Sequence, residues 1–324
     1  MASFLLRRLV QGLAIVFAVA TLTFVLIHAA PGEPFVTMLD DPRMTPEIRA
    51  AWRAQYGLDL PLPTQYVRFL TNTARGDLGT SFTYQRPVFD VLAAAVPPTL
   101  LLMSVALVLS FAGGIALGAL QAAHPGGWFD RLTGTATVVV AAVPDFWLAI
   151  AALFLFAVRW HLGVPSGGMI DPAMHRFYSP ARRVLDVLHH LMLPALTLTL
   201  VVGAAVARYQ RSALLEALPD DYVRTARAKG VPRSGVVYRH ALRNALLPTV
   251  TLFGLGFPAL LGGAVFVETV FSWPGMGGLT VGAVGNHDYP LVLAATIVGS
   301  IMVVVGGLVA DVLYAAVDPR LRRA

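Results

Sequence analysis

Residues 9–30, LVQGLAIVFAVATLTFVLIHAA, decide the fold class of this chain. The run contains no ionisable side chain except His28. Because about 20 helical residues are needed to cross the hydrocarbon core of a bilayer, the run is long enough for a membrane-spanning helix. Arg7 and Arg8 precede it, as in a secretory signal peptide, but a signal core usually has only about 7–15 residues. We therefore interpret the segment as an uncleaved transmembrane helix.

Five further apolar stretches have the same character. They cover residues 98–120, 134–157, 191–207, 245–271 and 291–317. The 324-residue chain is 56% apolar and 13% charged, whereas an average soluble domain is about 45–50% apolar and about 25% charged. This composition excludes a disordered tail, a coiled coil and an ordinary cytosolic enzyme. The sequence predicts an all-α membrane protein with six transmembrane helices.

The basic residues predict the orientation of these helices. If the N-terminus is cytoplasmic, the inside segments carry 14 basic and 5 acidic residues. Short cytoplasmic loops carry an excess of Lys and Arg, so we expect both termini in the cytoplasm. These inside loops also explain the net charge of +6, and no nucleic-acid partner is expected.

The spans divide the chain into three regions. We expect an N-terminal transmembrane helix at 1–30, an external loop region with short helices at 31–97, and a five-helix core at 98–324. Within the external region, Thr45-Pro46-Glu47 has the pattern of a helix start. This region either caps the bundle at the interface or meets an external partner or substrate, and the sequence leaves both open.

The loop at residues 208–248, within the core, has the clearest local pattern. Asp220 and Asp221 can cap a short helix over residues 222–229, since acids are favourable at a helix N-terminus. Gly230 supplies a left-handed stop, and Pro232 prevents continuation of the helix.

Ser234 is expected to cap a second short helix in the same loop, which runs through Arg239, His240 and Arg243 toward the next span. A short capped helix held between two long spans is a rigid lever, through which a bound partner can move both spans. The alternative is a positively charged face that only contacts anionic lipid.

The loop also resembles the EAA loop of bacterial ABC importer permeases. The resemblance lies in residues 221–230, DYVRTARAKG, and residues 240–248, HALRNALLP. The common form of the motif is Glu-Ala-Ala-x3-Gly with a Leu-Pro further on. Here Arg224, Thr225 and Ala226 occupy the first three positions, and Gly230 matches the glycine.

Four other segments resemble the same family, so the resemblance covers nearly the whole chain. They are residues 56–62 (YGLDLPL), 76–81 (GDLGTS), 267–277 (VETVFSWPGMG) and 318–320 (DPR). The chain is identified as similar to the B-type permease subunit of dipeptide, oligopeptide and nickel importers, a binding-protein-dependent transport system inner-membrane component.

The resemblance implies a type I ABC importer permease fold, multi-pass in the bacterial cytoplasmic (inner) membrane. It implies ATP-driven translocation of peptides or similar small solutes that an external binding protein hands over. The implied partners are a second homologous permease subunit, two ABC ATPase subunits or domains, the binding protein and the lipid bilayer.

The chain itself is expected to bind no cofactor and to be no enzyme, with ATP and Mg on the partner ATPase subunits. Its only lysine, Lys229, is followed by Gly230, so a Gly-Lys-Ser/Thr phosphate-binding loop cannot form. No Cys occurs, and no catalytic or metal-binding set is found. The resemblance implies that the ATPase-coupling surface comprises Asp221, Tyr222, Arg224, Thr225, Ala226, Lys229, Gly230 and Pro232.

Three acids lie inside predicted spans: Asp145, Glu268 and Asp311. Ionisable groups at membrane depth are costly, so they mark a polar pathway or a structural pair. Pro144 should kink its span and free backbone carbonyls to line a cavity. Pro144, Asp145 and Glu268 are therefore candidates for the pathway or its gate. The alternative function is a proton-coupled secondary transporter that uses Asp145 or Glu268.

Overall fold

The computed structural model describes residues 2–30, 45–55, 57–261 and 264–317. Within these ranges every regular element is a helix, and β structure is limited to one isolated antiparallel bridge between Thr80 and Pro87. The chain forms two compact units. One comprises Met1, Pro98–Pro274 and Val303–Ala324, and the other comprises Ala2–Pro97 and Gly275–Met302. The predicted division at residues 30 and 97 stays a prediction.

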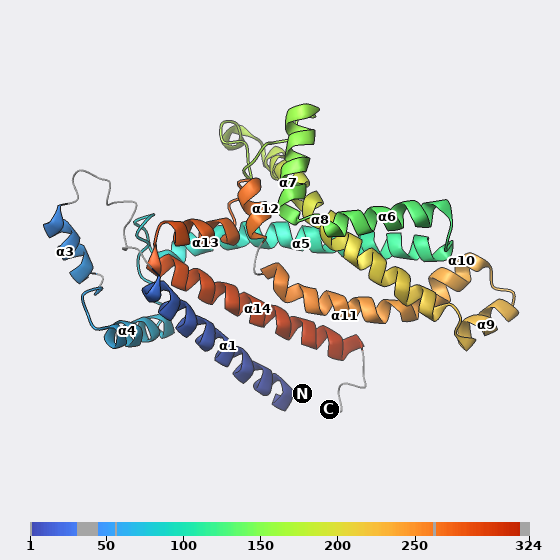
Figure 1. The fold of residues 1–324 in the computed structure, drawn as a ribbon, viewed down its shortest axis with the longest axis horizontal. Coiled ribbons are helices and arrows are strands. Elements are labelled where there is room, and N and C mark those ends of the chain that lie inside the picture. Colours follow the sequence, from blue (N-terminus) through green and yellow to red (C-terminus); the bar gives the residue numbers. More distant parts are fainter. Residues whose placement is uncertain (1, 31–44, 56, 262–263, 318–324) are drawn as a thin grey trace. The chain divides into compact units, whose positions relative to one another are not determined.

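The second of these units contains four complete helices and the first parts of two longer ones (Figure 1). They are α1 (Ala2–Ala29), α3 (Pro46–Gln55), α4 (Leu62–Ala74), α13 (Met276–Gly285), and the starts of α5 (Val88–Ala123) and α14 (Tyr289–Val317). As predicted, a helix starts after Thr45, whose Oγ1 accepts the N–H of Ile48 at 3.4 Å. Val88 and Leu291 are fully buried in the core of this unit.

The first unit contains the helical run that carries the candidate site. Its elements are α6 (Trp128–Ala142), α7 (Asp145–Leu153), the π-helical η1 (Phe154–Arg159), η2 (His175–Phe177), α8 (Pro180–Ala217), α9 (Asp221–Ala228), α10 (Arg233–Gly235), the π-helical η3 (Val236–Ala241), α11 (Leu242–Leu261) and α12 (Val265–Val270). The rest of α5 and of α14 belongs to the same unit.

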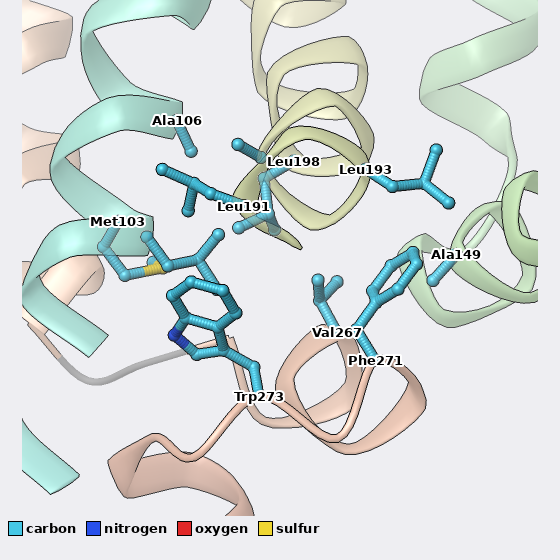
Figure 2. Packing of buried hydrophobic residues seen from close by; sticks show 11 residues of the cluster. Met103, Ala106, Ala149, Leu191, Leu193, Leu198, Val267, Phe271 and Trp273 are labelled. Carbon is cyan, nitrogen blue, oxygen red and sulfur yellow. The ribbon is translucent and has the colours of Figure 1, made fainter. Parts of the chain in front are cut away.

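An apolar cluster joins four of these helices (Figure 2). Met103 comes from α5, Leu191 and Leu198 from α8, and Val267 from α12. The indole of Trp273 is also buried here, and its Nε1 donates to the carbonyl of Pro98 at 2.9 Å. The cluster thus fixes the segment after α12 against the start of this part of α5.

The predicted spans are confirmed where the apolar run continues as one helix. Within the described residues, four helices are long and apolar enough to cross a membrane, and a bent helix pair makes a possible fifth. The four lie at Leu6–Ala29, Val88–Ala123, Pro180–Ala217 and Tyr289–Asp311. The helices around residues 98–120 and 191–207 are longer than predicted. Both ends of α5 and the C-terminal end of α8 pack in apolar clusters outside the purely apolar windows.

Two predicted spans are not single helices. Residues 134–157 fall on α6, α7 and η1, and the axes bend by 105° at the break. Val143 is extended at ψ 130°, the conformation that a following proline imposes. The predicted kink at Pro144 is therefore a break. Residues 245–271 likewise fall on α11 and α12, and the sequence between them contains Gly262-Gly263, which has low helix propensity.

Gly114 and Gly118 place α5 close against α8. A Cβ atom added at Gly114 would lie 2.7 Å from the Val206 Cβ and 2.9 Å from the Gly203 carbonyl oxygen. At Gly118 it would meet the backbone of Ala207. The Gly-x3-Gly spacing here permits close helix packing, as it does in many membrane helices.

Candidate functional site

The loop between α8 and α11 contains one isolated short helix, α9, at the corner between α8 and α10 (Figure 1). The predicted second helix is present, but it is not short, because helical backbone continues from Arg233 through η3 into α11. Its start is also two residues earlier than predicted, with Pro232 and not Ser234 in the N-cap position. Only short connections therefore separate α9 from α8 before it and from the continuous α10–α11 run after it.

Helix α9 starts and ends one residue earlier than the predicted range 222–229, and its capping chemistry differs. Asp220 occupies the N-cap position in an extended conformation. Its backbone carbonyl accepts the N–H groups of Val223 at 3.0 Å and Arg224 at 3.1 Å. In the described structure its side chain makes no capping hydrogen bond, so this carboxylate is available at the surface.

The end of α9 is a complete Schellman motif. The N–H of Gly230 donates to the carbonyl of Arg227 at 3.0 Å, and the N–H of Val231 donates to that of Ala226 at 3.2 Å. Gly230 has a φ of +79°, which non-glycine residues rarely adopt. The predicted left-handed stop is confirmed. Among the described atoms nothing lies within 4 Å of a Cβ built there, so the constraint is backbone conformation alone.

One face of α9 is buried against the ends of the long helices. Val223 is completely buried and Ala226 is 6% exposed. They pack with residues from the end of α5, the end of α8 and the start of the α10–α11 run, namely Ala119, Ala122, Ala123, Leu214, Ala217, Val236, Val237, Ala241 and Ala245. We call this cluster the α9 seat. Sequence reasoning did not single out Val223, although Val223 and Ala226 have the spacing of one helix face.

The opposite face of α9 is polar and exposed. The exposed members of the predicted coupling set are Asp221, Tyr222, Arg224, Thr225, Lys229, Gly230 and Pro232. Ala226 differs, because it lies in the seat. Arg224 and Asp221 approach to 3.4 Å with side chains 69% and 97% exposed, a geometry that contributes little to stability.

Polar contacts bind the seat to the surrounding helices. Arg233 donates through Nη2 to the Ala123 carbonyl at 2.6 Å, where α5 ends with unpaired carbonyl groups. The fully buried Gln210 of α8 accepts from Thr249 of α11 at 2.6 Å and donates to the Ala245 carbonyl at 3.2 Å. These contacts make α8 and α11 a rigid support for α9.

The candidate gate residues lie on two neighbouring helices, α7 and α12. Asp145, half-buried, accepts the N–H of Phe146 at 2.7 Å, while Pro144 before it is exposed. Glu268 is fully buried on α12 and accepts from Thr99 Oγ1 at 2.8 Å. The rings of Phe146 and Phe266 lie 5.9 Å apart, so the starts of α7 and α12 are in contact.

Two buried carboxylates were missed by sequence reasoning. Asp288 accepts from Ser81 Oγ at 2.5 Å and from the N–H groups of Thr83 at 2.9 Å and Leu291 at 3.3 Å. Asp288 immediately before Tyr289-Pro290 is a helix-start signal that could have been recognised. The carboxylate of Asp186 makes a hydrogen bond with Nδ1 of His175 at 2.6 Å. These two residues are eleven positions apart, and sequence spacing does not reveal their contact.

These features define a helical membrane protein that displays a short polar helix on a rigid support. Residues 114–323 match the family described as binding-protein-dependent transport system inner membrane component, and residues 1–103 match the N-terminal part of such components. The resemblance at residues 318–320 lies outside the described structure.

Full-length relatives agree with this match. The chain is 39% identical to the oligopeptide transport system permease protein AppB of Bacillus subtilis over 99% of both chains. It is 38% identical to the glutathione transport system permease protein GsiC of Salmonella paratyphi A and 35% identical to the dipeptide transport system permease protein DppB of Escherichia coli, each over 99% of both chains.

The chain belongs to the family of binding-protein-dependent transport system inner membrane components. It is a multi-pass inner-membrane permease subunit and a transport component, not a catalytic enzyme. The alternative of a proton-coupled secondary transporter is wrong, since the matching relatives are permeases of peptide and glutathione transport systems.

Proposed function

We propose that α9 is the helix through which ATPase subunits drive this permease. The observation that carries the proposal is the combination of a buried seat with an exposed polar face. Val223 and Ala226 fix the helix to α8 and α11, while Arg224, Thr225 and Lys229 project outward. A partner that displaces this face moves two long helices together, because α9 ends in a Schellman motif and not in a flexible linker.

The proposed orientation places this loop in the cytoplasm. Six spans with both termini inside would give 14 basic residues in the cytoplasmic segments. In this arrangement the bent pair α6–α7 and the successive helices α11 and α12 each make one crossing. The chain would pair with a second, similar permease, and ATP and Mg would bind only to the two ATPase subunits or domains.

The proposed cargo is a peptide or a similar small solute delivered by an external binding protein. This assignment follows the names of the relatives, which are permeases for oligopeptides, dipeptides and glutathione. We propose that Pro144, Asp145 and Glu268 belong to the gate, since α7 and α12 are in contact and a proline break gives α7 a pivot.

Reconstitution tests the proposed function directly. Vesicles holding the complete importer, with the binding protein outside and ATP inside, should accumulate labelled dipeptide or tripeptide. Vesicles holding this chain alone, or a complex with an ATPase that cannot hydrolyse ATP, should accumulate none. Uptake by the chain alone, or uptake that continues without hydrolysis, would contradict the proposal.

A further inference from the structure

Two cavities follow the groove between α6 and α8, apart from the outer face of α9. The first, of about 570 Å³, lies where α6 begins and α8 nears its end. The second, of about 310 Å³, lies deeper between α5, α6 and α8. Thr137 lines both cavities. Along α8 the lining passes from Leu200 and Ala204 to Arg208 and Ser212, which are four residues apart and share one helix face.

The first cavity is positively charged. It is lined by Arg131, Arg208 and Arg211 and by one acid, Asp130. Arg211 engages both oxygens of Asp130 at 2.7 and 2.8 Å, and the Gly126 N–H donates to the same carboxylate at 2.8 Å. Asp130 is thus neutralised within the protein. Arg131 and Arg208 are exposed cavity-lining residues and make no ion pair with any described residue, although the charge of Arg131 also acts on the nearby Asp130.

Gln121, which also lines this cavity, has an acceptor atom that needs a donor. Its side chain is fully buried, and Nε2 donates to Thr133 Oγ1 at 2.9 Å. The Thr133 hydroxyl donates its own proton to the Phe129 carbonyl at 2.6 Å, so it can only accept from Gln121. This fixes the amide orientation and leaves Gln121 Oε1 without a hydrogen-bond partner among the described residues. A buried unpaired acceptor is costly, which points to a ligand hydroxyl.

The second cavity has a mainly apolar lining and suits a hydrocarbon chain, although the buried hydroxyl of Thr199 in this lining has no hydrogen-bond partner among the described residues. Its lining includes Leu109, Leu117, Val140 and Leu200, and close packing of Gly114 against α8 closes its inner side. At the other end, Trp128 is 77% exposed at the start of α6, as expected for an aromatic side chain at a membrane interface. A cationic polar cavity therefore continues into an apolar one.

We propose that the two cavities form one binding site for an anionic glycerophospholipid with a hydroxyl-bearing headgroup, such as phosphatidylglycerol. Arg131 and Arg208 bind its phosphate, a headgroup hydroxyl donates to Gln121 Oε1, and one acyl chain fills the apolar cavity. Basic pockets between membrane helices are known places for anionic headgroups. The proposed function and orientation decide only which leaflet supplies this lipid, namely the cytoplasmic leaflet. Free glycerol 3-phosphate has the same polar groups but no acyl chain.

Native mass spectrometry of the purified importer complex tests this site with defined lipids. Wild-type complex should retain phosphatidylglycerol in preference to zwitterionic phosphatidylethanolamine and to phosphatidylmethanol, which is anionic but has no headgroup hydroxyl. Arg131→Gln and Arg208→Gln should each weaken phosphatidylglycerol binding about fivefold, the effect of one basic residue beside anionic lipid. Arg176→Gln, an exposed arginine that lines neither cavity, is the matched control and should change nothing.

Two further variants separate the polar and apolar parts. Gln121→Leu should abolish the preference over phosphatidylmethanol while anionic lipid still binds. Ala136→Phe, which fills the apolar cavity, should weaken lipid binding but not competition by glycerol 3-phosphate. Equal retention of the three lipids by wild type, or unchanged retention in the double arginine variant, would overturn the proposal. So would glycerol 3-phosphate binding as tightly as the lipid, because the site would then serve a soluble anion.

Discussion

Helices α4 and α9 end in the same way but are supported differently. Each finishes with an exposed alanine, a basic C-cap residue and a left-handed glycine, in the sequences Ala74-Arg75-Gly76 and Ala228-Lys229-Gly230. Both glycines have nearly the same φ, +81° and +79°. In α4 the N–H groups of Gly76 and Asp77 donate to Thr73 and Asn72, which repeats the Schellman pattern of α9.

The two helices differ in the number of their residues that are buried and in what these residues pack against. Although α4 is described throughout, it has no buried residue. It contacts α1 through aromatic rings, with the partly exposed Phe69 stacked 5.6 Å from the buried Phe24 of α1. By contrast α9, although shorter, has the completely buried Val223 and an apolar cluster that extends to three long helices. The stop motif alone therefore does not distinguish α9, the proposed coupling helix, from α4, whereas the buried seat under an exposed polar face does.

The largest effect is expected from a charge in the α9 seat. Val223→Asp would bury an unpaired carboxylate among alanine, leucine and valine side chains, at a cost of roughly 3–5 kcal/mol. Limited proteolysis should then cut the loop between α8 and α10, and ATP-driven uptake should be lost. Thr71→Asp on the exposed surface of α4 is the control and should leave both measurements unchanged. An uncut, transporting Val223→Asp protein would show that the seat does not hold α9.

An intermediate effect is expected at the two matched glycines. Gly76→Ala and Gly230→Ala should each cost about 1 kcal/mol, because both residues are left-handed and neither methyl group meets a described atom within 4 Å. Thermal unfolding of the purified complex should therefore respond similarly to the two changes.

Measurements of transport should distinguish the same two variants. Only Gly230→Ala, or more strongly Gly230→Val, should lower the number of cargo molecules moved per ATP hydrolysed, since the change re-aims the coupling helix. An equal loss of coupling in the Gly76 variant would remove the distinction between the two helices.

The smallest structural effect is expected on the exposed face of α9. Arg224→Gln should change the free energy of unfolding by less than about 0.5 kcal/mol, because the side chain is 69% exposed and its contact with Asp221 is long. Binding of the ATPase to the permease should nevertheless weaken and lose part of its salt dependence, as measured by pull-down across a salt series. Arg75→Gln on α4 provides the comparison, with no change in ATPase binding expected.

The sequence predicted the parts of this fold that local chemistry controls. The continuous spans, the position of α9 to within one residue and its stop at Gly230 follow from apolar length, acids and glycine. At Pro144 the sequence predicted a kink and the structure has a break, because a proline is compatible with either. Pro194 lies buried within the unbroken α8, so packing decides whether a proline bends or breaks a helix.

The support of the candidate site could be predicted only in part. Val223 and Ala226 share a helix face, but nothing local shows that alanines from α5 and α8 will cover it. The hydrogen bonds of Gln210 to α11 and of Arg233 to α5 likewise join distant parts of the sequence. Long-range packing thus fixes the loop motif to the long helices, and single-sequence patterns do not report it.

Site-specific cross-linking tests the central claim most directly, since the chain has no natural cysteine. Cysteine is introduced at Ala228 or, as the matched control, at Ala74, both exposed at the last position of a short helix. In cells that co-express the partner subunits, the Ala228→Cys protein should cross-link to an ATPase subunit and the Ala74→Cys protein should not. If Ala228→Cys reacts only with lipid-borne reagents, or if Ala74→Cys captures the ATPase equally well, α9 is not the coupling helix.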